Sequence, residues 1–112
     1  MEELIMNKKI LDLSIFEEET LDITLMDKRV IHIVKPTEAM VIKVLQMRNI
    51  SEKSSPEAII KAFNSLTMAI LNSNDAGIVF DTKYVEELSM KMKSAIINAY
   101  SDFITGLQSN PT

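Results

Sequence analysis

Few side chains in this sequence are suited to catalysis or metal binding. Among its 112 residues there is no cysteine and only one histidine, His32. Without cysteine there is no thiol nucleophile, no disulfide and no thiolate-bound metal, and a site that needs several imidazoles is excluded as well. A Ser-His-Asp triad would have to be built around His32, which alternates with valines in a β-branched run. We therefore interpret His32 as a packed or strand-edge residue.

Acidic residues are the remaining candidates for chemistry. Glu17, Glu18 and Glu19 are consecutive, so in an extended segment they point to different sides and form a solvated acidic edge rather than a metal site. The loop 72–83 has Gly77 at the sixth position of an EF-hand register, but its twelfth position is a lysine where calcium needs a bidentate acid. We expect no metal, no cofactor and no enzymatic activity.

The overall composition is that of an acidic folded domain. Hydrophobic residues make up 46% of the chain and charged residues 25%, which is ordinary for a globular protein. A formal net charge of -4 argues against a nucleic-acid partner. The first seven residues are too short and too acidic for a signal peptide, and no apolar run approaches the roughly 20 residues of a membrane span. We expect one domain, residues 1–112, in the cytoplasm and away from membranes.

The first third of the chain has the period-two pattern of extended structure. Apolar and polar residues alternate over 10–15, which predicts a short extended segment. Alternation over 21–25 and a β-branched run over 30–34 predict a β-hairpin. Because Asp27-Lys28 between them lacks the glycine of a two-residue turn, a longer turn is expected. Two strands alone are marginal, so helices must cover one face.

The remainder of the chain has helical spacing and helix-capping residues. Thr37 is expected to cap a helix over 38–48. Ser55-Pro56 is expected to start a second helix that ends near Asn72, in a loop where Gly77 is suited to a positive φ. A third helical region is expected from Asp81 or Thr82 to about Gln108, bent near Lys93-Ser94. The prediction is an α+β, mostly α fold, with an N-terminal β-hairpin (within 1–35) followed by three or four helices (within 37–108).

The last helix has too many apolar residues for one buried face. Its expected core stripe is Val85, Leu88, Met92, Ala95, Ile96, Ala99, Phe103 and Leu107, and the central core residues of the domain are expected to be Phe63, Leu66, Ile70, Leu88, Met92 and Phe103. A second stripe consists of Met90, Ile97, Tyr100 and Ile104. That stripe is either buried within the domain or exposed as a surface for a partner or a second copy, and we favour the exposed, partner-binding alternative.

Several segments, taken in order, carry a family resemblance. They are Ile10-Leu11-Asp12-Leu13-Ser14, Thr20-Leu21-Asp22-Ile23-Thr24-Leu25, Val30 through Lys35-Pro36-Thr37, Ala69-Ile70-Leu71-Asn72-Ser73-Asn74 and Ala99-Tyr100-Ser101-Asp102-Phe103-Ile104. Together they resemble the small tail assembly chaperones of long-tailed bacteriophages and prophages of Gram-positive bacteria.

The resemblance implies a non-enzymatic helper. Such proteins coat the tape measure protein, keep it soluble and bring major tail tube protein subunits to it in the host bacterial cytoplasm, and they are absent from the mature virion. Homo-oligomerisation is left open. The alternative is a bacterial regulatory or adaptor protein that binds another protein through its C-terminal helix.

Overall fold

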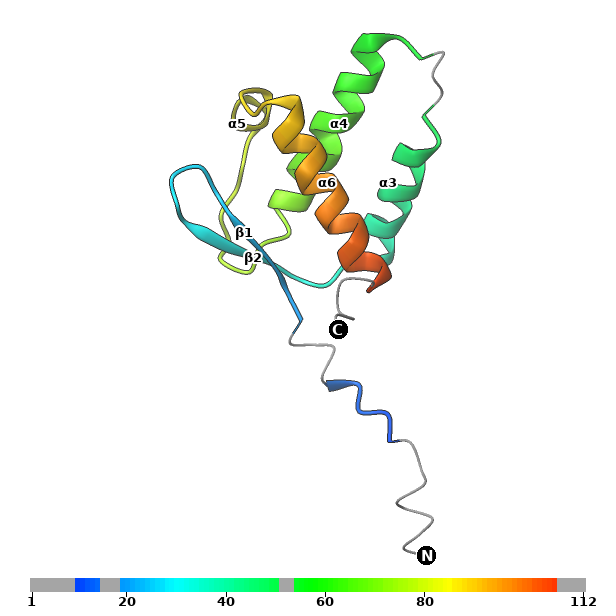
Figure 1. Ribbon diagram of the computed structural model, residues 1–112, viewed down its shortest axis with the longest axis vertical. Helices are drawn as coiled ribbons and strands as arrows, with labels where there is room; N and C mark the ends of the chain where they lie inside the picture. The colour runs from blue at the N-terminus through cyan, green and yellow to red at the C-terminus, as the bar shows by residue number, and fades with distance from the viewer. Residues whose placement is uncertain (1–9, 15–18, 51–53, 107–112) are drawn as a thin grey trace, which may run out of the picture.

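A β-hairpin followed by helices forms the domain (Figure 1). This computed structural model describes residues 10–14, 19–50 and 54–106. Within them lie the two strands and four helices β1 (Leu21–Thr24), β2 (Val30–Ile33), α3 (Glu38–Arg48), α4 (Pro56–Leu71), α5 (Thr82–Glu86) and α6 (Met90–Thr105). The predicted fold class, α+β and mostly α with an N-terminal hairpin, is therefore confirmed.

The hairpin pairs antiparallel, with Leu21 opposite Ile33 and Thr24 opposite Val30. The Leu25 N–H donates to the Arg29 carbonyl at 2.8 Å, and Lys28 between them has a φ of 76°. A three-residue loop whose last residue is left-handed matches the twist of the two strands. The expected longer turn is thus confirmed, with a lysine at the position that usually favours glycine.

The loop between α4 and α5 covers the outer edge of β2. Asp75 N–H donates to the His32 carbonyl, and Val34 N–H donates to the Ser73 carbonyl, each at 3.0 Å. Side-chain amides shape this loop, because Asn74 Nδ2 donates to two carbonyls while its Oδ1 accepts two N–H groups. Gly77 has the predicted positive φ, 73°. One edge of the small sheet is consequently closed.

The helices begin at the expected caps, with one difference. The Thr37 side chain accepts the Met40 N–H and the Ser55 side chain accepts the Ala58 N–H, so the predicted caps of α3 and α4 are confirmed. The third helical region is two helices instead of one bent helix. The Ser89 side chain accepts the N–H of Met92 and caps a new helix, α6. A bend was predicted near Lys93-Ser94, but α6 is continuous there. The predicted end near Gln108 lies outside the described residues; α6 closes at Gly106, with a φ of 74°.

The core lies where the hairpin, α4 and α6 meet. Its fully buried side chains include Ile31, Ile33, Ile70, Leu71, Val85 and Tyr100. Of the predicted central residues, Leu66, Ile70 and Leu88 are buried, and Phe63 and Phe103 are half-buried against the core. Met92 is exposed, so its assignment to the core was wrong.

Residues 10–14 stand apart from the rest of the domain (Figure 1). They contain no strand; instead the Ser14 N–H and hydroxyl both donate to Asp12 Oδ1, which bends the chain locally. The extended segment predicted for 10–15 is therefore not formed over 10–14, and Ile15 lies outside the described residues.

Candidate functional site

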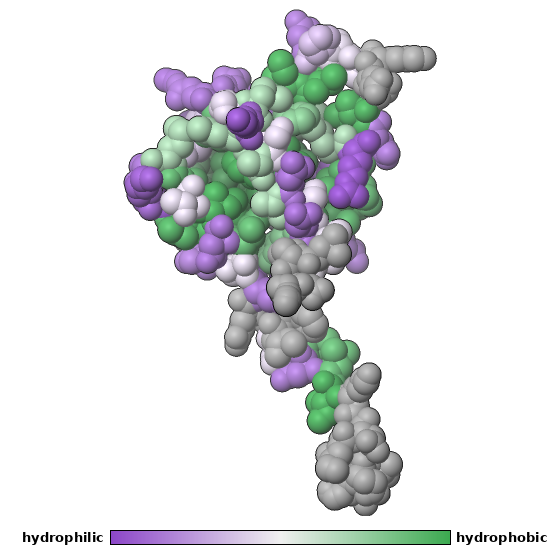
Figure 2. Space-filling model, viewed as in Figure 1, coloured by the Kyte–Doolittle hydropathy of each residue, from purple (hydrophilic) through white to green (hydrophobic). Residues whose placement is uncertain are grey.

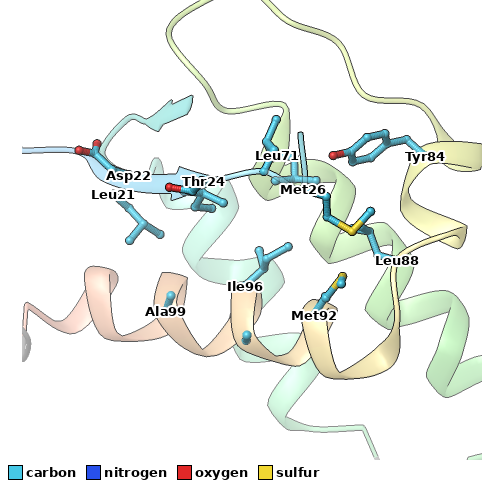
Figure 3. Close-up of a pocket in the computed structure, with 13 residues that line it drawn as sticks. Leu21, Asp22, Thr24, Met26, Leu71, Tyr84, Leu88, Met92, Ile96 and Ala99 are labelled. Carbon is cyan, nitrogen blue, oxygen red and sulfur yellow. The ribbon is translucent and has the colours of Figure 1, made fainter. Parts of the chain in front are cut away.

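An apolar groove of about 360 Å³ lies between β1 and α6 (Figure 3). We call it the β1–α6 groove. One side is formed by β1 and Met26, and the other by Met92, Ala95, Ile96 and Ala99 of α6. Ala95 and Ala99 are four residues apart and therefore lie on the same face of the helix. Their small side chains leave the hollow that larger residues would fill.

The edge of β1 beside this groove has unpaired backbone groups. Because Leu25 and Arg29 form a hydrogen-bonded pair, antiparallel alternation turns the N–H and C=O groups of Asp22 and Thr24 away from β2. The same alternation turns the His32 carbonyl outward on β2, as its bond to Asp75 requires. No backbone partner for Asp22 or Thr24 lies on that outer side among residues 10–14, 19–50 and 54–106. An added strand could pair there.

The two faces of the hairpin differ in polarity. Leu21 and Ile23 share a face with the buried Ile31 and Ile33, and they are only half-buried because the sheet ends at β1. In Figure 3, Leu21 points toward α6 whereas the Asp22 carboxylate points away from it. The groove is therefore the uncovered margin of the hydrophobic core.

The outer face of the hairpin holds the single histidine. His32 shares a face with Val30 and Val34, as predicted, but this face is exposed, so the interpretation of His32 as a packed residue was wrong. Its Nδ1 is 2.7 Å from Asp22 Oδ1. This hydrogen bond raises the pKa of His32, with further help from the negative charge of Asp22. It also lowers the pKa of Asp22, which accepts a second hydrogen bond from the Thr20 hydroxyl. Both side chains are about half exposed, so the pair is a surface contact.

The predicted partner-binding residues lie mostly inside the domain. Tyr100 is fully buried, Ile97 is 8% exposed, and Ile104 is partly buried against the core. Only Met90, at 41%, is exposed as expected. The expected exposure of Ile97, Tyr100 and Ile104 was therefore wrong.

The predicted division of the last helical region into two stripes is only partly wrong: Val85 and Leu88 are buried as expected, and Ile96 and Phe103 pack partly buried against the core. The stripe 93, 97, 100 and 104 faces α4, and it includes Lys93, whose Nζ donates to Asn64 Oδ1 at 2.6 Å. Met92, Ala95, Ile96 and Ala99 of the predicted core stripe instead line the β1–α6 groove. The apolar spacing did not distinguish the stripe that packs from the one that borders a hollow, whereas Ala95 and Ala99 were a signal that could have located the hollow.

A second hollow lies between α3 and α6. It has a volume of about 500 Å³; Val44, Met47 and Phe63 line one side, and on its α6 side Ile97 is surrounded by Ser94, Asn98, Ser101 and Asp102. These polar side chains remain well placed for water, so an apolar segment gains little by covering them. The β1–α6 groove is the better candidate for binding.

The acidic segments show no arrangement for metal binding in the described part of the chain. No three His, Cys, Asp or Glu residues are grouped there as ligands. In the loop 72–83 the Asn74 side chain is already engaged with backbone groups. Glu19 is exposed, and Glu17 and Glu18 lie outside the described residues.

Binding of an apolar segment is thus what the site can do. An extended peptide could pair with β1 and place alternate side chains in the groove. None of the described helices is both long and apolar enough to cross a membrane. Comparisons with known protein families, with curated proteins and with solved structures gave no match to this chain.

Proposed function

We propose that this chain is a non-enzymatic assembly chaperone of the phage tail type that its segments resemble. It binds the tape measure protein, helps to recruit major tail tube protein, works in the host bacterial cytoplasm and leaves before the virion is complete. One observation carries the proposal: the β1–α6 groove combines an apolar hollow with an open strand edge.

Such a site suits a chaperone because backbone pairing recognises any extended chain. Hydrogen bonds from Asp22 and Thr24 supply affinity that does not depend on sequence, and the groove favours segments with apolar side chains at alternate positions. The methionines at its rim, Met26 and Met92, are flexible and adapt to different side chains. Repeated weak contacts along a long apolar client fit this combination.

Co-expression with the tape measure protein of the same genome tests the proposal. The tagged chain should co-purify with it, and Ala95→Arg should abolish the complex because it fills the groove and brings a charge to an apolar surface. The matched control is Ala58→Arg, since Ala58 is exposed near the start of α4. Circular dichroism should show all three proteins folded.

Two results would reject the proposal. In the first, the unaltered chain does not retain the tape measure protein. In the second, Ala95→Arg and Ala58→Arg retain it equally well, which would place the client surface elsewhere. Retention of an identified host regulator in place of the tape measure protein would favour the adaptor alternative.

A further inference from the structure

Residues Ile10–Ser14 form an apolar arm on the outside of the domain. Ile10, Leu11 and Leu13 are 76%, 73% and 67% exposed. Figure 2 shows these apolar side chains well away from the body of the domain. Three large aliphatic side chains this close together are costly to leave in water, and a contiguous apolar group of this kind marks a contact surface.

The arm has the residue pattern that the β1–α6 groove requires. A strand added at β1 would turn alternate side chains toward α6 and the others toward the outer face. Leu11 and Leu13 would then lie in the groove, and Ile10, Asp12 and Ser14 would lie on the outer face, which bears His32, Asp22 and the exposed Val30 and Val34.

We propose that the arm of one copy adds as a third strand to β1 of a second copy, with Leu11 and Leu13 in the groove. Residues 10–14 lie outside the groove of their own domain (Figure 1), so that groove is open to the arm of a second copy. Straightening the arm breaks the exposed hydrogen bonds between Ser14 and Asp12, which exchange for bonds to water at small net cost. The inference goes beyond the proposed function and does not depend on it.

The size of the contact sets its strength. A five-residue arm on a four-residue strand makes a small interface, so we expect association between about 10 μM and about 1 mM, in the range of transient complexes. Exchange of both arms between two copies would double the contact.

The absence of cysteine from the sequence allows a direct cross-linking test. Leu13→Cys and Ala95→Cys are prepared as separate proteins, mixed and oxidised; a disulfide-linked pair of the two variants is expected. Leu13→Cys mixed with Ala58→Cys is the control, because Ala58 lies outside the groove. Equal cross-linking in both mixtures, or none in the first, would overturn the proposal. So would a double Leu13→Cys, Ala95→Cys chain that closes its disulfide within dilute monomers, because the arm would then occupy its own groove.

Sedimentation equilibrium gives a second, independent measurement. The apparent mass of the unaltered chain should rise with concentration over the stated range, while Leu11→Asp with Leu13→Asp should remain monomeric and folded. Ile60→Asp, on the exposed side of α4, should associate like the unaltered chain. A monomeric unaltered chain, or undiminished association of the arm variant, would refute the inference. Neither measurement involves the tape measure protein, so this failure is distinct from failure of the proposed function.

Discussion

The Tyr100 hydroxyl provides the sharpest test of the α4–α6 interface. Tyr100 is 0% exposed, and its hydroxyl has no hydrogen-bond partner among the described residues. A buried hydroxyl without a partner costs about 1–3 kcal/mol of desolvation. Tyr100→Phe keeps the ring and removes that cost, so we expect the free energy of unfolding to rise by about 1 kcal/mol. For a domain of this size the melting temperature should then rise by about 4 °C.

Tyr100→Ala measures how much the buried ring contributes to the free energy of unfolding. Deleting a buried aromatic side chain typically costs about 3–5 kcal/mol, which is a large part of the roughly 5–15 kcal/mol that stabilises a domain. Urea denaturation followed by circular dichroism gives both values. A loss of 1 kcal/mol or more in Tyr100→Phe would refute the reasoning, because the hydroxyl would then be making a bond in the folded state.

Alkaline titration checks the same burial without relying on stability. Burial raises the pKa of Tyr100 to about 12, above its ordinary value of 10.0. A folded-state pKa that is raised means that stability is complete below about pH 10 and is lost as the pH rises toward 12. In a Tyr84→Phe background Tyr100 is the sole phenol, so its absorbance titration reports this residue alone. A midpoint at its ordinary value would contradict the buried placement.

Three further perturbations test separate parts of the structure. Ile97→Asp should cost about 3–5 kcal/mol or unfold the domain, because it buries an unpaired charge, whereas exposed Ile60→Asp should change stability by less than about 1 kcal/mol in urea titrations. NMR titration should give a pKa of His32 above 6.5 in the unaltered chain and a lower one in Asp22→Asn. The pair stabilises the fold most between the pKa values of Asp22 and His32. Its contribution is lost as the pH rises through the pKa of His32 or falls through the pKa of Asp22. Ser89→Ala should cost about 1 kcal/mol on thermal unfolding, since it removes the cap of α6.

Local signals predicted the elements of this fold well. Alternation located both strands, and Thr37 and Ser55 located the starts of two helices, because each of these signals acts within a few residues. Ser89 carried an equally good capping signal, yet the surrounding helical pattern concealed it. One bent helix was therefore predicted, with its bend near Lys93-Ser94, whereas the chain has two helices that are separated by residues 87–89.

The candidate site was not predictable from the same signals. Both stripes of α6 are apolar, and only tertiary packing decides which one meets α4. Lys93 lies in the stripe that meets α4, and sequence patterns do not reveal that Asn64 Oδ1 accepts a hydrogen bond from its buried ammonium group. The open edge of β1 depends on which strand the distant loop 72–80 covers, and that choice is made by contacts far apart in the sequence.

The closed edge of the sheet depends on the side-chain amide of Asn74. Deamidation would replace its Nδ2 donor by a carboxylate oxygen, which repels the Leu71 and Ile78 carbonyls that the amide now binds at 2.8 Å. The neighbouring residues Ser73 and Asp75 hold the loop against β2, so loosening this turn would uncover the outer edge of β2. A molecule without this amide would present two open strand edges in place of one, and it could join neighbours on both sides.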